Sequence, residues 1–383
     1  MQIPPKSLPD TTVLVYTSAS PDLEKPVQDS LDELAGSVHR DDLQVVAQMG
    51  SRGQAVRSLL NGNASEVVPN VDMSKPQSLQ DFLSWGMKKY PAKHYVVVVG
   101  GHGAGAFGVV TDSKRSHMMQ LPQLRQAIED SGCRPQMVIF NACLMAQAET
   151  VTELAGVTPV VVGSQTAEQG LGMPLGAWLQ QTPSLDDPVA SAALLVKDCA
   201  LESVRSPEVS AFRTDVDPAL EAHLRTLGQV IRQNPQQRDH IREVLASQPH
   251  LWDRDWDRPL IDQIDLGRLA EALGNDEHVS PEIRQASQKL VADLQKMIVS
   301  PAAEAQPGLS TDPHGLSIYA PHAAWESMPT PSGPLKDVYD RLRLSSDTGW
   351  AQTLSWLVQA GPPIPLEGDP QELRSWRRTS DGR

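Results

Sequence analysis

The chain has few cysteines, no long apolar run and no surplus of positive charge, and each shortage excludes a class of protein. Only three of its 383 residues are cysteine, and none forms a CxxC pair, so we expect neither a disulfide framework nor a cysteine-based zinc site. No apolar run approaches the roughly 20 residues of a membrane span, so we expect no contact with membrane. The formal net charge of −14 disfavours nucleic acid as a partner.

The first ten residues, MQIPPKSLPD, contain one lysine and no apolar stretch of the length that a secretory signal needs. We therefore expect a cytoplasmic protein. At roughly 150 residues per domain, the length allows two or three domains or one elaborated α/β unit.

Short valine-rich runs alternate with helical patterns through the first two thirds of the chain, which is typical of a mostly parallel sheet flanked by helices. We expect strands at residues 12–16, 43–47, 95–99, 137–140, 159–162, 209–212 and 315–319. We expect helices at residues 22–35, 77–89, 121–131, 144–155, 188–203, 219–233, 281–298 and 350–360. The strand at 315–319 should bring the chain back toward the sheet.

Two candidate catalytic residues follow two of the buried strands. His102 lies in the glycine-rich turn GGHGAG after YVVVV, and Cys143 lies in NACLMA after MVIF. The amphipathic segment between them permits a right-handed crossover, which would place both residues at the sheet edge where open α/β folds bind ligands.

A thiol at the start of the next helix, beside an imidazolium, has two reasons for a lowered pKa and an increased fraction of thiolate. The backbone N–H groups of Gly103 and Cys143 could bind a developing oxyanion, because Gly103 has no side chain to block the approach. No third, orienting carboxylate is evident, so we expect a dyad. Cys133 and Cys199 lack this context, and we expect them to be packing residues.

Two other motifs favour different functions more weakly. The GxGxxG match from Gly103 to Gly108 is typical of a dinucleotide-binding loop, but the residues after it lack helical periodicity. The cluster Asp253, Asp255 and Asp257 suggests calcium, but arginines interrupt it and EF-hand spacing is absent. We expect no cofactor and no metal ligands, with calcium as the alternative left open.

These motifs together resemble the clostripain family of caspase-like cysteine peptidases. The segments TVLVYTSASPDLE, HYVVVVGGHGAG, NACLMA and GLSIYAP occur in the order found in that family. The resemblance implies a caspase-like three-layer α/β sandwich with a mostly parallel central sheet. It also implies His102 and Cys143 as the catalytic dyad, with the Gly103 and Cys143 amides as the oxyanion hole.

The resemblance also sets the expected domain organisation. We expect a single peptidase domain over residues 10–360, with a core at 10–215, a helical elaboration at 216–310 and a returning strand and helices at 311–360. The Pro-rich remainder, 361–383, should form a mobile tail.

One position departs from the family, which commonly has Asp two residues before the nucleophile, where it helps to bind Arg or Lys at P1. This chain has Asn141 there, and an amide lacks the charge that makes Arg recognition strong. Glu168 could supply a compensating charge.

Some relatives cut themselves between the dyad residues, which makes Lys114 and Arg115 candidate processing sites. The alternative is that these two residues lie in a solvated loop.

We therefore expect a cysteine endopeptidase that acts on polypeptides in limited intracellular proteolysis, with an uncertain P1 preference and an unknown oligomeric state. The alternative is a catalytically silent or highly selective caspase-like module that binds a partner. A nucleotide-binding enzyme ranks third.

Overall fold

The computed structural model of the chain describes residues 8–358, apart from 113, 115, 169–170, 183–184, 202–207, 250, 252–261, 301–313, 322–324, 328 and 331–332. The expected tail at 361–383 and the aspartates considered for calcium therefore lie outside the described residues. Among the residues described, no helix is both long and apolar enough to cross a membrane.

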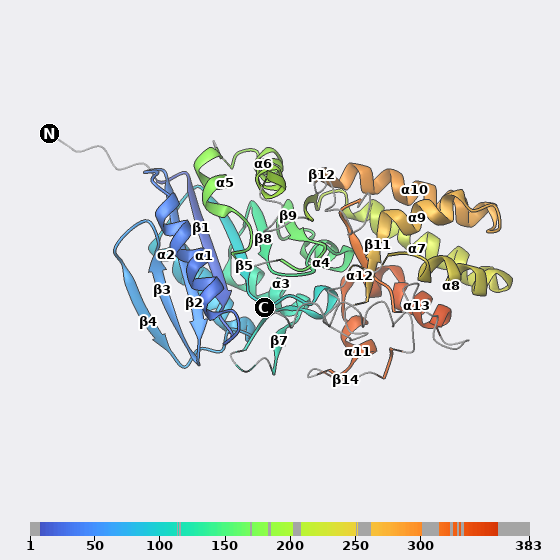
Figure 1. The fold of residues 1–383 in the computed structure, drawn as a ribbon, viewed down its shortest axis with the longest axis horizontal. Coiled ribbons are helices and arrows are strands. Elements are labelled where there is room, and N and C mark those ends of the chain that lie inside the picture. Colours follow the sequence, from blue (N-terminus) through green and yellow to red (C-terminus); the bar gives the residue numbers. More distant parts are fainter. Residues whose placement is uncertain are drawn as a thin grey trace, which may run out of the picture.

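A nine-stranded sheet forms the centre of the protein, in the order β12-β10-β9-β8-β5-β1-β2-β3-β4 (Figure 1). Its five middle strands, β9, β8, β5, β1 and β2, run parallel, and antiparallel strands extend both edges. The strands are β1 (Thr11–Ser18), β2 (Leu43–Ser51), β3 (Gln54–Leu59), β4 (Ser65–Pro69), β5 (His94–Gly100), β8 (Met137–Asn141), β9 (Val160–Ser164), β10 (Val209–Arg213) and β12 (Ile298–Ser300). The expected α/β architecture with a mostly parallel sheet is confirmed.

The valine runs form strands because both faces of the sheet are covered. Val96 and Val98 of β5 belong to one buried cluster, whereas Val97 and Val99 belong to a second cluster on the opposite face. All four are essentially inaccessible to solvent. This is why the run contains no polar residue: successive side chains point to opposite faces, and neither face meets water.

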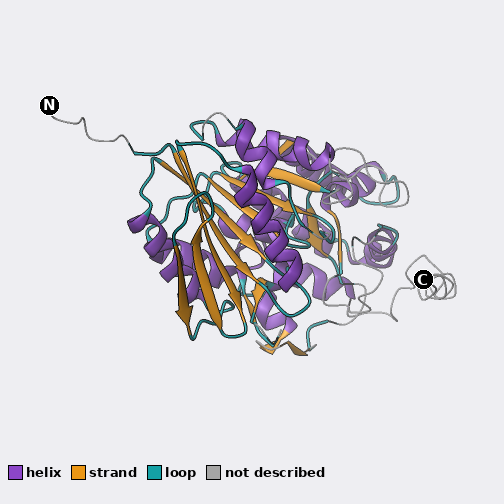
Figure 2. Ribbon diagram, turned by 60° about the vertical axis from the view of Figure 1, so that its left-hand side comes forward, coloured by secondary structure: helices purple, strands orange, loops and turns teal. Residues whose placement is uncertain are grey.

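Helices cover both faces, as Figure 2 shows. One face carries α1 (Glu24–Ser37), α5 (Leu175–Gln181) and α6 (Pro188–Leu201), and the other carries α2 (Pro76–Lys89), α3 (Leu121–Ser131) and α4 (Ala148–Leu154). Beyond the sheet lie α7 (Asp217–Gln233), α8 (Arg238–Ala246), α9 (Leu266–Asn275) and α10 (Pro281–Met297), at the right of Figure 1. The chain continues through α11 (Leu335–Tyr339), α12 (Arg343–Thr348) and α13 (Trp350–Val358).

Three two-stranded sheets complete the described structure. They are β6 (Val109–Thr111) with β7 (Met118–Met119), β11 (Gln263–Asp265) with β13 (Ser317–Tyr319), and β14 (Pro329–Thr330) with β15 (Gly333–Pro334). The expected strand at 315–319 is therefore a strand at Ser317–Tyr319, and it brings the chain back toward the sheet, as expected, without joining the nine-stranded sheet. It pairs with β11, and Ser317 N–H donates to the carbonyl of Ala146, 2.9 Å away, just before α4.

A buried carboxyl group joins the C-terminal part of the described chain to the sheet layer. Glu149 on α4 is fully buried, and its Oε1 accepts hydrogen bonds from the Tyr339 hydroxyl at 2.6 Å and from Tyr319 N–H at 3.0 Å. Burial raises the pKa of Glu149, although these bonds oppose the shift. The two bonds thus connect α11 and β13 to the helix that follows the β8 turn.

Tyr339→Phe should destabilise the protein by about 1–3 kcal/mol, because it removes one donor from a buried carboxyl group. Urea unfolding followed by circular dichroism measures the change. Tyr319→Phe is the matched control, since the Tyr319 hydroxyl has no hydrogen-bond partner among the described residues, and it should leave stability almost unchanged. Equal losses in the two variants would contradict the assignment.

Candidate active site

His102 lies in the turn that ends β5, and backbone geometry fixes its position. Gly101 has φ +122°, and a Cβ there would lie 2.9 Å from the carbonyl oxygen of Ser18, so the turn requires glycine. The carbonyl of His102 accepts a hydrogen bond from Val110 N–H at 2.9 Å. Val110 itself has φ 62°, which is strained for a β-branched residue.

Cys143 lies in the turn that follows β8, and not at the start of a helix as the sequence had suggested. The next helix, α4, begins only at Ala148. The prediction that a helix N-terminus lowers the pKa of this thiol is therefore wrong. The turn is instead held by two bonds to the end of β9 and the residues after it, from Leu144 N–H to Thr166 O at 3.1 Å and from Ala146 N–H to Ser164 O at 2.9 Å.

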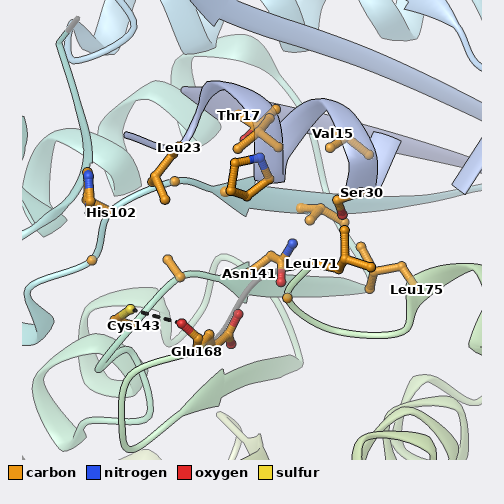
Figure 3. Close-up of a pocket in the computed structure, with 18 of the residues that line it drawn as sticks. Val15, Thr17, Leu23, Ser30, His102, Asn141, Cys143, Glu168, Leu171 and Leu175 are labelled. Carbon is orange, nitrogen blue, oxygen red and sulfur yellow. Dashed lines mark hydrogen bonds between the residues drawn. The ribbon is translucent and has the colours of Figure 1, made fainter. Parts of the chain in front are cut away.

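The sheet brings these two turns together. Strands β5 and β8 are parallel neighbours, with Gly100 opposite Asn141 at their carboxyl ends. A Cβ at Gly103 would lie 2.2 Å from the carbonyl oxygen of Cys143, so the loops are in direct contact only because residue 103 is glycine. Figure 3 shows His102 and Cys143 at the same end of one cavity.

A carboxylate that sequence reasoning missed contacts the histidine. Asp22 Oδ2 lies 3.1 Å from His102 Nε2, and the Ser20 hydroxyl donates to Asp22 Oδ1 at 2.6 Å. The Asp22 side chain is 44% exposed and that of His102 is 13% exposed. A carboxylate therefore lies beside His102, where we expected none. One signal was available: Asp22 follows β1, whose end pairs with the end of β5, with Thr17 opposite Gly100.

The cavity beside these residues has a volume of about 260 Å³ and mostly apolar walls. Its walls come from the carboxyl ends of β1, β5 and β8, from α1, and from the segment that leads into α5, and they include Leu23, Val27, Leu31, Leu171 and Leu175. Such walls can pack against the aliphatic part of a side chain, and the polar groups at one end can fix its tip.

Asn141 and Glu168 both line this cavity, but their polar atoms differ in availability. The Asn141 Oδ1 atom accepts a hydrogen bond from Met173 N–H at 2.8 Å, so the amide supports the loop before α5. The Glu168 Oε1 atom is buried and has no hydrogen-bond partner among the described residues. Burial raises the pKa of Glu168 to about 8.

The backbone of Glu168 also contacts the thiol. Its carbonyl oxygen lies 3.9 Å from Cys143 Sγ, within range of a weak S–H hydrogen bond (Figure 3). Glu168 thus contacts Cys143 through its backbone, and its side-chain carboxyl group lies in the cavity next to Cys143.

The remaining candidates lie elsewhere. Lys114 is exposed in the turn between β6 and β7, and Arg115 lies outside the described residues. Cys133 and Cys199 are both buried, and burial raises the pKa of Cys133 to about 12, which makes its thiol unreactive. The GxGxxG segment leads into strand β6 and not into a helix, so it is not a dinucleotide-binding loop.

Comparison with known proteins places this geometry in a family. The sequence model of the clostripain family matches residues 15–212, just over half of the chain. No curated protein sequence matches the chain.

Solved structures show the same fold. The inactive zymogen of a C11 protease from Parabacteroides distasonis is 19% identical, with a TM-score of 0.66 over 90% of this chain and 99% of that chain. A secreted C11 cysteine protease from Bacteroides thetaiotaomicron, in complex with an irreversible peptide inhibitor, is 17% identical, with a TM-score of 0.67 over 89% of this chain and 99% of that chain. The chain belongs to the clostripain family of cysteine peptidases.

Proposed function

We propose that this protein is an endopeptidase that cleaves peptide bonds through an acyl-thioester on Cys143, with His102 as its catalytic partner. One observation carries the proposal: two neighbouring parallel strands deliver a histidine and a cysteine to the same end of one cavity. The family match supports the reaction class.

The reaction begins when the proton of the Cys143 thiol passes to His102 and the resulting thiolate attacks the carbonyl carbon of the scissile bond. The carbonyl oxygen becomes an oxyanion that accepts hydrogen bonds from the backbone N–H groups of Gly103 and Cys143. His102 then gives a proton to the departing amine, so the C–N bond breaks and a thioester remains. Water attacks the thioester and releases the acid, and the thiol is restored.

Cys143→Ala should abolish labelling by an acyloxymethyl-ketone peptide probe, and His102→Ala should slow labelling by about a hundredfold or more. Mass spectrometry of the labelled protein locates the modified residue. Cys133→Ala serves as the control and should label normally.

Labelling of another residue, or of none, would contradict the proposed enzyme activity and favour the alternative of a silent module that binds a partner.

The same preparations test self-processing at Lys114 or Arg115, which remains a proposal: fragments that form in the parent protein and not in Cys143→Ala would support it.

Asp22 acts in this proposal as a positioning residue for His102. Its carboxylate accepts the Nε2–H of the imidazole, which fixes the tautomer and leaves Nδ1 for proton transfer. The Ser20 hydroxyl in turn holds the carboxylate. Because Asp22 is partly exposed, the contribution of this pair is smaller than that of a buried one.

Asp22→Asn should lower kcat by about tenfold and leave KM and the melting midpoint unchanged, since the amide fills the same space without the negative charge. Steady-state kinetics on a fluorogenic peptide separate the two constants. Asp29→Asn, which removes an exposed carboxylate paired with Lys25, is the matched control. An unchanged kcat in Asp22→Asn, or an equal loss in both variants, would refute the role.

The cavity contributes the P1 pocket in this proposal, with Glu168 as the group that receives a basic side chain. A desolvated carboxyl group whose Oε1 has no hydrogen-bond partner among the described residues gains more from a guanidinium or ammonium than an exposed carboxyl group does, and apolar walls suit the alkyl stem of Arg or Lys. Asn141 shapes the pocket and does not supply charge, because its oxygen is bonded to the loop.

The pocket predicts a pH dependence of specificity. With a pKa of about 8, Glu168 is mostly protonated at pH 6.5, and binding of a cation must expel that proton. The ratio of kcat/KM for an Arg-P1 peptide to that for its uncharged citrulline analogue should therefore rise by up to about tenfold per pH unit below pH 8 and then level off.

Glu168→Gln should make this ratio small and independent of pH. Glu33→Gln on α1 is the control, and it should leave the pH dependence of the ratio unchanged. A flat ratio in the parent protein, or a higher kcat/KM for an apolar P1 residue, would show that Glu168 does not bind a P1 cation.

The proposal also includes a cellular location and a biological role. The related Bacteroides thetaiotaomicron enzyme is described as secreted. The cytoplasmic location expected from this sequence, with limited intracellular proteolysis, stays a prediction. Immunodetection in separated cytoplasmic, periplasmic and culture fractions tests it, and detection of the chain mainly outside the cytoplasm would refute it.

A further inference from the structure

Two histidines and an aspartate converge in the helical part of the protein, away from the cavity. His240 lies on α8, and Asp276 and His278 lie in the connection between α9 and α10. One ligand atom from each of the three lies within 4.8 Å of the other two. His240 Nε2 is 2.5 Å from Asp276 Oδ2, and His278 Nδ1 is 3.1 Å from Asp276 Oδ1.

We propose that His240, Asp276 and His278 bind a divalent transition-metal ion, with Zn²⁺ as the cation that suits them best. Two imidazole nitrogens and a carboxylate oxygen are a common zinc donor set, and a water can complete a tetrahedron. This site goes beyond the proposed peptidase reaction and needs no group from it.

The present distances are close to those that a metal requires. Tetrahedral zinc with ligands at 2.0–2.2 Å separates its donor atoms by about 3.3 Å. His240 contacts Oδ2 of Asp276 and His278 contacts Oδ1, so an ion bound through one of these oxygens requires small side-chain movements in a cluster whose ligand atoms already lie within 4.8 Å of one another. The His278 side chain is 83% exposed, so little packing opposes a small movement of its ring.

The backbone that carries two of the ligands is already fixed to the helix that carries the third. The Gln237 side chain donates to His278 O at 3.0 Å, and its Oε1 accepts from Ser280 N–H at 3.0 Å. Because Gln237 directly precedes α8, these two bonds hold the 276–280 connection beside His240. A site whose backbone is in place before binding loses less entropy when the ion arrives.

Two electrostatic features favour a cation here. The Asp276 carboxylate lies between the two imidazole rings, with one oxygen toward each ring. On the far side of the His240 ring, Nδ1 lies 4.0 Å from Glu243 Oε2. At this distance Glu243 makes no hydrogen bond to the ring, and it contributes only its negative charge to the surroundings of the ion.

The position of the site indicates its role. Helices α8, α9 and α10 lie at the right of Figure 1, and none of them lines the cavity that holds Cys143. A metal ion there would join α8 to the connection between α9 and α10. We therefore assign it a structural role in this helical region.

The test uses the full chain without a histidine tag and with Cys143→Ala, so that the thiol cannot bind zinc. Isothermal titration with ZnCl2 should show one site that is lost, or weakened at least tenfold, in His278→Ala. Zinc at about a hundredfold excess over its dissociation constant should raise the melting midpoint by about 3 °C in the parent protein and not in that variant. Co²⁺ should give the visible absorption bands of a tetrahedral nitrogen and oxygen site.

His39→Ala is the matched control, because His39 is also an exposed histidine and lies far from α8 in the sequence. It should bind zinc like the parent protein. Melting without metal shows whether each variant is folded, and the exposed position of His278 makes its loss harmless to the apo protein. Absence of binding, binding that survives His278→Ala, or equal loss in His39→Ala would each overturn the proposal.

Discussion

The parallel pairing of β5 with β8 is the constraint on which the candidate site depends. It sets Gly100 opposite Asn141, so the next residues of both strands leave the sheet at the same edge and meet. A slip of one residue would turn every side chain of one strand to the wrong face and separate the two loops. The register is fixed because both faces of these strands are buried, and a slip would exchange valines between two packed cores.

The loops that leave this edge are held in costly conformations. Leu144 follows the cysteine with φ 66°, and Val110, which bonds to His102, has φ 62°. Each such residue costs of order 1–3 kcal/mol and persists only where its surroundings leave no alternative. For Leu144, the N–H bond to Thr166 O supplies that restraint. The rigid core thus maintains strain next to the thiol, and the turn cannot relax into a longer α4.

Much of the fold could be predicted from the sequence because its central strands are covered on both faces. All seven predicted strands exist, and for the central ones the reason is that short continuous apolar runs with no amphipathic helical pattern permit little else. The hairpin of β3 and β4 was missed because it lies at the sheet edge, where Val67 is exposed and the pattern of burial is mixed. The hydrophobic sequence pattern of an edge strand is weaker than that of a central strand, because polar residues are tolerated on an edge strand.

The site was less predictable, because its geometry depends on contacts between distant segments. The placement of His102 and Cys143 beside one cavity followed from strand order, which the spacing of the motifs could indicate. The contact of Asp22 with His102 spans 80 residues and depends on how the turn after β1 folds over the end of β5. The start of α4 could not be predicted either. The residues after Cys143 have helical composition, but two of their N–H groups bond to the end of β9 and the residues that follow it.

The segment after β9 connects recognition to chemistry in the proposed function. Its carbonyl groups at Thr166 and Glu168 contact Leu144 N–H and Cys143 Sγ, and the Glu168 side chain lines the cavity. With the acidic group on this segment and not on the end of β8, a P1 cation would be drawn to the same residues that hold the nucleophile. Binding energy from that cation would then order the backbone around the thiol, so the effect of losing the charge should extend beyond substrate affinity to the rate of the chemical step.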